Sequence, residues 1–349
     1  MKKIEIGNKL VGDEQPIFIV AEIGVNHNGD IRLAKKLIDA AKDAGADAVK
    51  FQAFKTEKVV TKYAEKAKYQ KETTGLSESQ YDMIRRLELK DEEIRELYNY
   101  AKKNNIIFLS SAFDKESVDL LDNLGVPAFK VASGEITNFP LLRYIAEKKK
   151  PIILSTGMST IGEIEEALEV IREKGVENIV LLHCVTSYPA KIEDVNLRVI
   201  EALRRRFKLP VGFSDHTLGI TIPIAVAALG AVLVEKHFTL DRTLPGPDHR
   251  ASLEPDELKD MVRAVRDVEK ALGDRVKKPT KDEERIKKVV RRSIVAKMGI
   301  PKGTAITEDM LDFKRPGVGI EPKYLNEIIG KKAKKDIKPD GLITFDKLV

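Results

Sequence analysis

Eight short apolar runs within the first 240 residues constrain the fold of this chain more than any other feature. Each run has the length of a buried strand, and most are followed by a stretch whose apolar residues recur with helical spacing. Strand followed by helix, repeated eight times, predicts a (β/α)8 TIM barrel, in which the carboxyl ends of the strands build the active site. The runs are IFIVAEIG (17–24), AVKFQAF (48–54), IIFLSSAF (106–113), AFKVASG (128–134), PIILSTGM (151–158), IVLLHCVT (179–186), VGFSDHT (211–217) and VLVEKHFT (232–239).

The rest of the chain predicts a small second domain and one long active-site loop. Residues 1–272 are assigned to the barrel, with a hairpin at 3–12 that could plug its amino-terminal mouth. Residues 273–288 are charged and weakly apolar, which indicates a linker, and 289–349 form a small domain of short runs broken by glycine and proline. The polar, lysine-rich segment 55–90 interrupts the regular spacing after the second strand, so we expect it to serve the active site.

Composition narrows the class of protein. With 349 residues and 42% hydrophobic content, the chain has room for a barrel and a large core, which excludes a disordered protein. Cys184 is the single cysteine, so there is no internal disulfide, and we expect a cytoplasmic protein without a signal peptide or membrane span. The net charge of +6 comes from mixed lysine and glutamate without a basic, aromatic stripe, so we expect no nucleic-acid partner.

Two histidines at neighbouring strand ends suggest a metal site. Side chains alternate along a strand, so Ser214 shares a face with His216, and Glu235 shares a face with His237. Two inward imidazoles could hold a divalent metal and leave positions open for water and substrate. The alternative is that both are hydrogen-bonded packing residues. The same alternation directs Lys236 away from the site.

Lys50 and Lys130 occupy apolar strands, where an unpaired ammonium is costly. We expect the two lysines to grip a phosphate or carboxylate. Two alternatives stay open: salt bridges to Glu22 and Glu235, or a Schiff-base nucleophile. Hydroxyl and glycine residues that suit an anion follow neighbouring strands, namely Ser133, Ser155, Thr156 and Gly157.

Three further strand ends carry polar residues. Glu22 is within reach of anything bound at the mouth, whereas 26–29 suits a tight polar turn that caps the first helix. The loop 245–255 contains Asp248, His249 and Arg250, which could bind sugar hydroxyls or only fold the loop. His183 and Cys184 must face opposite ways, and Cys184 is expected to pack rather than act as a nucleophile.

The motifs taken together resemble the sialic acid synthase (N-acetylneuraminate synthase) family. The matching segments, in order along nearly the whole chain, are AEIGVNHNGD, VKFQAF, FKVASGE, LSTGM, HCVTSYPA, GFSDHT, EKHFT and GPDH. The tail KRPGVGI, in a small domain rich in glycine and proline, resembles the antifreeze-like (SAF) domain of those enzymes.

The resemblance implies a reaction and a set of site residues. Phosphoenolpyruvate would condense with the open-chain aldehyde of an N-acylated hexose, N-acetylmannosamine first among them, to give N-acetylneuraminate and phosphate. A divalent ion, expected to be Mn2+ with Mg2+ or Co2+ as alternatives, would be held by His216 and His237. A swapped homodimer would place Arg315 over the partner's site. Positions that would bind phosphoenolpyruvate are Lys50, Lys130, Ser133, Ser155 and Ser214, and those that would contact the sugar are Glu22, Gln52, Tyr188 and Asp248. Glu22 and Glu235 are the candidates to orient water or sugar.

Thr186 departs from the family pattern, because bacterial sialic acid synthases often have asparagine there. Relatives that act on legionaminic, pseudaminic or spore-coat precursors resemble this chain at that motif, so the same chemistry on another amino sugar is the alternative. The loss of the asparagine amide could also change one contact to phosphoenolpyruvate. Two other classes stay open: a Schiff-base aldolase, and a non-catalytic sugar-binding or ice-binding protein.

Overall fold

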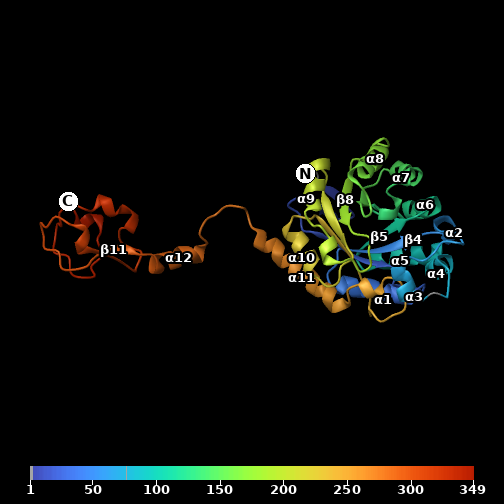
Figure 1. Ribbon diagram of the computed structural model, residues 1–349, viewed down its shortest axis with the longest axis horizontal. Helices are drawn as coiled ribbons and strands as arrows, with labels where there is room; N and C mark the ends of the chain where they lie inside the picture. Colours follow the sequence, from blue (N-terminus) through green and yellow to red (C-terminus); the bar gives the residue numbers. More distant parts are fainter. Residues whose placement is uncertain (1–2, 76) are drawn as a thin grey trace. The chain divides into compact units, whose positions relative to one another are not determined.

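The computed structural model describes residues 3–75 and 77–349 and divides the chain into two compact units, Met1–Gly273 and Asp274–Val349 (Figure 1). The first unit confirms the predicted barrel. Its eight parallel strands close in the order β10-β3-β4-β5-β6-β7-β8-β9. The strands are β3 (Phe18–Gly24), β4 (Ala48–Ala53), β5 (Ile107–Ala112), β6 (Phe129–Val131), β7 (Ile152–Ser155), β8 (Ile179–Cys184), β9 (Val211–Asp215) and β10 (Leu233–His237).

Helices surround these strands in Figure 1, and their starts follow from local sequence. Asp30, Asp114 and Thr160 each accept a hydrogen bond from a backbone N–H in the first turn of the helix that follows. The buried faces of the helices pack on the outward side chains of the strands and form the main core. The helices are α1 (Ile31–Asp43), α5 (Asp91–Lys103), α6 (Lys115–Leu124), α7 (Phe139–Glu147), α8 (Ile161–Arg172), α9 (Val199–Phe207), α10 (Thr221–Ala228) and α11 (Pro255–Leu272).

A hairpin, β1 (Ile4–Ile6) and β2 (Lys9–Val11), closes the amino-terminal end of the barrel as expected. Ile4, Ile6 and Val11 are buried in one cluster with Phe18, Val20 and other inward side chains of the strands. The barrel interior is therefore apolar at this end. Polar residues that face inward have space only at the carboxyl ends.

The long segment after β4 is more ordered than a polar loop. It contains three short helices, α2 (Thr56–Val59), α3 (Lys68–Thr74) and α4 (Gln80–Leu87). Glu88 accepts hydrogen bonds from the backbone and hydroxyl of Thr56, which ties the two ends of the segment together. Leu87 packs with Val25 and Phe54 at the mouth of the barrel.

The second unit begins inside the predicted linker. Helix α12 (Lys281–Val290) occupies the last part of 273–288, because Thr280 and Glu283 form a capping box at its start. Its charges also suit a helix, with acidic residues in the first turn and lysines in the last. The remainder pairs β11 (Ser293–Ala296) with β12 (Leu311–Lys314) around a core that includes Ile294, Ile306 and Ile343.

Short 3-10 helices complete the chain at Ser133–Glu135, Ile192–Asp194, His249–Ala251, Glu308–Met310, Pro322–Glu327 and Phe345–Lys347. Within the described residues, none of the helices has the length and apolar character needed to cross a membrane.

Candidate active site

The carboxyl ends of the barrel strands surround a cavity of about 260 Å³. Most predicted site residues line it, whereas Thr156, Gly157, His249, Arg250 and Arg315 do not. The predicted residues that line it are Glu22, Lys50, Gln52, Lys130, Ser133, Ser155, Thr186, Tyr188, Ser214, His216, Glu235, His237 and Asp248. The parallel register explains the gathering, because His237 is the direct neighbour of Glu22, and Glu22 that of Lys50, across three adjacent strands.

Two lysines and two carboxylates form the floor of the cavity. Lys50 Nζ lies 2.7 Å from Glu22 Oε2 and 3.8 Å from Glu235 Oε1, and Lys130 Nζ lies 3.6 Å from Glu235 Oε1. Lys130 also donates a 2.7 Å hydrogen bond to Ser155 Oγ. The ion pairs of the salt-bridge alternative are thus present. The same ammonium groups line the cavity and are available to an anion that enters it.

The two carboxyls differ in acidity. Burial raises the pKa of Glu22 to about 7, although Lys50 acts in the opposite direction. Burial also tends to raise the pKa of Glu235, but Lys130 and Lys50 outweigh it, so the pKa of Glu235 is lowered. Ser214 Oγ donates a 2.9 Å hydrogen bond to Glu235 Oε1, which further favours the charged form. Glu22 is therefore the carboxyl that can hold a proton near neutral pH.

His216 and His237 lie side by side at the carboxyl ends of β9 and β10, with ring centroids 5.4 Å apart. His216 Nδ1 lies 2.7 Å from the carbonyl oxygen of Val185, a contact that places a proton on Nδ1, so that Nε2 has the free lone pair when the ring is neutral. Burial lowers the pKa of His237 well below its ordinary value, so its ring is neutral. His237 Nδ1 is buried and has no hydrogen-bond partner among the described residues. Burial tends to lower the pKa of His216, but Cys184 and the Val185 carbonyl outweigh it, so the pKa of His216 is raised. Two imidazoles that line the cavity fit a divalent metal, which would bind both rings in their neutral form.

Only His216 and His237 are proposed here as protein ligands of a divalent metal. Among the residues that the structure describes, no group of three or more histidine, cysteine, aspartate or glutamate side chains is arranged to hold a metal ion. An ion at this edge would take its other ligands from water or substrate, as catalytic metals do.

Strand alternation placed Lys236 correctly, and it left open which of His183 and Cys184 faces the cavity. Lys236 is absent from the cavity lining and pairs with Asp215 instead. Cys184 lines the cavity, and its Sγ lies 3.8 Å from His216 Nδ1. His183 faces away and contacts the carbonyl oxygen of Val195 at 2.7 Å.

The two polar loops at the mouth separate into structural and cavity-lining residues. Asn26 Nδ2 donates to the carbonyl oxygen of Phe238 at 2.9 Å, and Asn28 has a positive φ of 52°, so this segment is the tight turn. His249 is likewise structural, because its ring contacts the Thr239 hydroxyl and Asn28. Asp248 lines the cavity, and burial raises its pKa to about 6.

Gly157 leaves space for the hydroxyl groups of Ser133 and Thr186, two residues that line the cavity. A Cβ at Gly157 would lie 2.2 Å from Thr186 Oγ1 and 2.8 Å from Ser133 Oγ, so only glycine fits. Gly157 N donates a 3.0 Å hydrogen bond to Ser133 Oγ. Thr186 Oγ1 is buried without a hydrogen-bond partner in the described part of the chain, which leaves it available to a ligand.

Sequence reasoning missed an apolar wall on one side of the cavity. It named the segment 55–90 but none of its residues. Met83, Ile84 and Leu87 have helical spacing and form one face of α4, a signal that was available. The wall residues, all of which line the cavity, are Val25, Phe54, Val59, Tyr69, Met83, Ile84, Leu87 and Phe113, and the polar side chain of Gln70 lines the cavity beside them.

Aromatic rings connect this wall with the histidines. The ring of Tyr69 on α3 stacks on that of Tyr188, with centroids 5.0 Å apart. The Tyr188 ring in turn lies 4.1 Å from that of His216 and 5.6 Å from that of His237. Arg315 lies in the second unit, exposed in the turn after β12, and its part in the site stays a prediction.

A TIM barrel whose carboxyl end gathers paired lysines, two histidines and an apolar wall around one cavity has the arrangement of an enzyme active site. The NeuB family matches residues 37–277, and the SAF domain matches 291–349. The chain therefore belongs to the NeuB family of sugar-acid synthases, which use phosphoenolpyruvate and an amino sugar.

Individual relatives agree with this assignment. N,N'-diacetyllegionaminic acid synthase of Campylobacter jejuni is 53% identical over 327 residues, covering 93% of this chain and 98% of that protein. N-acetylneuraminate-9-phosphate synthase of Homo sapiens is 40% identical over 336 residues, covering 95% and 93%. The structure of N-acetylneuraminic acid synthetase from Leptospira borgpetersenii matches with a TM-score of 0.72 at 36% identity, covering 82% of this chain and 95% of that one.

Proposed function

We propose that this synthase condenses phosphoenolpyruvate with a 2,4-diacetamido trideoxy hexose to form N,N'-diacetyllegionaminic acid and phosphate. The relative that carries this activity in its name shares 53% of its residues with the chain, against 40% for the N-acetylneuraminate-9-phosphate synthase. The legionaminate alternative is therefore favoured over the expected N-acetylmannosamine.

The apolar wall is the structural observation that carries the proposal. A trideoxy sugar has a methyl group where N-acetylmannosamine has a hydroxymethyl group, and a second acetamido methyl group. Met83, Ile84 and Leu87 offer apolar contact for such groups. A hydroxyl facing these side chains would lose its hydrogen bonds to water, which costs binding energy.

The opposite side of the cavity suits phosphoenolpyruvate. Lys50 and Lys130 would hold its phosphate and carboxylate, with Ser133, Ser155 and the unpartnered Thr186 hydroxyl as further donors. An arriving anion would compete with Glu22 and Glu235 for the two ammonium groups. When the ion pair between Glu22 and Lys50 is replaced by a contact between Lys50 and the anion, Glu22 can take up a proton, because its pKa is already about 7.

Positioning accounts for much of the chemistry. C3 of the enol must approach the aldehyde carbon. Phosphoenolpyruvate bound at the lysines and the sugar bound at the apolar wall would lie next to each other in the same cavity, which favours this approach. As the new carbon–carbon bond forms, the aldehyde oxygen becomes a hydroxyl and needs a proton. Glu22 is the residue that could supply it. Water then adds at C2, and phosphate leaves.

A divalent ion, Mn2+ or else Mg2+ or Co2+, would be held by His216 and His237. When bound, such an ion polarises the aldehyde oxygen as a Lewis acid. We propose as well that the protein acts as a homodimer in which Arg315 of the small domain completes the partner's site.

A panel of amino sugars assayed for phosphate release with phosphoenolpyruvate, with and without Mn2+, tests the function. We expect kcat/KM for the 2,4-diacetamido trideoxy sugar to exceed that for N-acetylmannosamine by about tenfold or more. A higher kcat/KM for N-acetylmannosamine would return the assignment to N-acetylneuraminate. Phosphate release that no sugar stimulates would overturn the synthase reaction itself.

A further inference from the structure

Lys66 is a buried lysine outside the barrel, and the reaction described above does not use it. It lies in the segment between α2 and α3, and its side chain is 2% exposed. A buried ammonium lowers stability by several kcal/mol unless it is paired and hydrogen-bonded. Its place in a mostly exposed segment therefore needs a reason.

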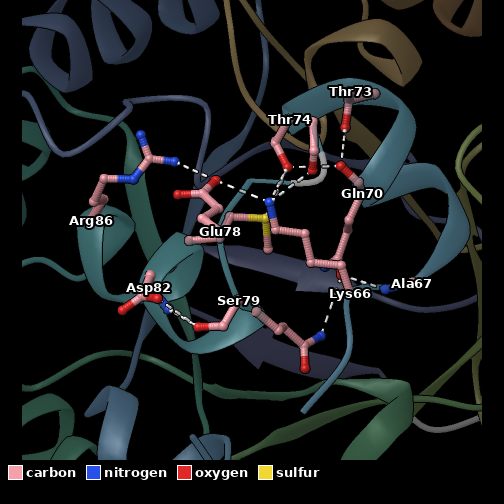
Figure 2. Close-up of polar contacts among 12 residues, drawn as sticks. Lys66, Ala67, Gln70, Thr73, Thr74, Glu78, Ser79, Asp82 and Arg86 are labelled. Carbon is pink, nitrogen blue, oxygen red and sulfur yellow. Dashed lines mark hydrogen bonds and ion pairs between the residues drawn. The ribbon is translucent and has the colours of Figure 1, made fainter. Parts of the chain in front are cut away.

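Three acceptors surround the Lys66 ammonium group in the described part of the chain. Lys66 Nζ donates to Thr74 Oγ1 at 2.9 Å, to the carbonyl oxygen of Gly75 at 3.1 Å and to Glu78 Oε1 at 3.0 Å. Figure 2 shows Lys66 between Thr74 and Glu78, with Arg86 reaching the same carboxylate. All three ammonium protons thus have acceptors.

These contacts join the two helices that build the wall. Thr74 and Gly75 lie at the end of α3, and Thr74 Oγ1 also donates to the carbonyl oxygen of Gln70 at 2.7 Å. Glu78 precedes α4 and receives a 2.7 Å contact from Arg86 Nη2 on that helix. Lys66 therefore fastens the end of α3 to the start of α4.

The other contacts of α3 with its surroundings are longer or weaker, namely a 3.3 Å hydrogen bond from Gln80 Nε2 to Gln70 Oε1 and a 3.5 Å contact of Thr74 Oγ1 with Met83 Sδ. None of the seven residues of this helix, all in the described part of the chain, is buried, and so short a helix is not stable by itself in water. Yet α3 presents Tyr69 and Gln70 to the cavity, and Tyr69 stacks on Tyr188. Lys66 adds three contacts of 2.9–3.1 Å from a buried ammonium group, which makes it the strongest polar link described between α3 and the start of α4.

We propose that Lys66 is a positioning residue for the sugar end of the cavity. Its ammonium group holds α3 and α4 together, so that Tyr69 and Gln70 on one helix, and Met83, Ile84 and Leu87 on the other, form one preassembled surface for the sugar. The phosphoenolpyruvate end does not depend on it, because Lys50 and Lys130 sit on barrel strands fixed by the sheet.

The inference rests on the proposed function only for its sugar substrate, so its test has two readouts. Lys66→Met removes the ammonium while Glu78 keeps Arg86 as a partner, which avoids an orphaned charge. Lys71→Met is the matched control, since Lys71 lies on α3 but forms an exposed pair with Glu65, the two side chains being 38% and 84% exposed.

The first readout is kinetic. In Lys66→Met we expect KM for the sugar to rise about tenfold or more, with KM for phosphoenolpyruvate changed by less than about twofold. Lys71→Met should match the wild type. A Lys66→Met variant with an unchanged sugar KM, or with both KM values raised together, would overturn the positioning role.

The second readout, hydrogen exchange of the backbone amides of residues 66–75 and 77–88, needs no substrate. It should be about tenfold faster in Lys66→Met than in Lys71→Met, because the fastening of α3 is lost. Glu78→Gln, which keeps the shape and removes the charge, should change exchange in the same direction. Equal exchange in all variants refutes the inference whichever sugar the enzyme uses, and absence of wild-type turnover counts against the proposed function alone.

Discussion

Lys236 Nζ lies 2.7 Å from Asp215 Oδ2, and both side chains are fully buried. The two residues are direct neighbours on β10 and β9, one position away from His237 and His216 respectively. Asp215 Oδ1 also accepts a hydrogen bond from Thr217 N at 2.9 Å, and Lys236 donates to the carbonyl oxygen of Thr217. A closed ionic network thus lies behind the strand ends that present the two histidines.

Breaking this pair should destabilise the barrel strongly. Lys236→Met leaves the Asp215 carboxylate buried without its cation, and we expect the free energy of unfolding to fall by about 3–5 kcal/mol. The double variant Lys236→Met/Asp215→Leu should recover much of the loss, since it removes both charges. Denaturant-induced unfolding of the barrel measures these changes.

The control for that prediction is Lys270→Met, which removes an exposed lysine paired with Asp267, the side chains being 78% and 64% exposed. It should change the free energy of unfolding by at most about 1 kcal/mol. A Lys236→Met variant as stable as this control would show that the buried pair contributes nothing.

The pair also shows what sequence could and could not predict. Alternation along a strand is local, so the sequence alone placed Lys236 away from the cavity and His237 toward it. The same local patterns predicted all eight strands and the polar mouth. Asp215 was not identified as the partner, because a pairing across strands depends on the register between them.

The apolar wall and α12 were missed for a different reason. Met83, Ile84 and Leu87 sit in a segment whose average composition is polar, and their burial arises only when α4 packs on the barrel mouth. Helix α12 has no buried residue among those described, so its sequence lacks the apolar periodicity that would predict a helix. Its capping box was the readable signal.

Lys50 and Lys130 should be needed for phosphoenolpyruvate rather than for a Schiff base. Lys50→Met and Lys130→Met each remove a charged donor, so we expect kcat/KM for phosphoenolpyruvate to fall about 10–100-fold. Steady-state kinetics measure this, with Lys58→Met, an exposed lysine near the same strand, as the unaffected control. Borohydride reduction with pyruvate should leave the wild-type mass unchanged, whereas a trapped adduct would favour the aldolase.

His27 should make the barrel sensitive to acid. Burial lowers its pKa from 6.5 to about 4, so the folded protein holds it neutral while the unfolded chain takes up a proton below pH 6.5. This contribution to stability is complete above pH 6.5 and is lost as the pH falls toward 4. The shift corresponds to about 3 kcal/mol over that window.

Unfolding at pH 7 and pH 5 measures this effect: going from pH 7 to pH 5, the free energy of unfolding of His27→Gln should fall less, or rise more, than that of the wild type. Glu22 and Asp248, whose pKa values burial raises to about 7 and about 6, act in the opposite direction in both proteins. His249, whose pKa burial also lowers to about 4, retains the same sign and accounts for part of the remaining difference. An identical pH dependence in His27→Gln and wild type would contradict the assignment.

Mixed dimers test the role of Arg315 across subunits. In a twofold dimer each site would combine the barrel of one chain with Arg315 of the other. Arg315→Ala and His237→Ala should each be inactive alone. After subunit exchange, one site of each mixed dimer has both native residues, so phosphate release should reappear, with exchange confirmed by native mass spectrometry of differently tagged chains.

The matched control mixes Arg315→Ala with the double variant Arg315→Ala/His237→Ala, which contains no native Arg315 and should stay inactive. Recovery limited to the first mixture supports the shared site, and inactivity of both mixtures after confirmed exchange rules it out.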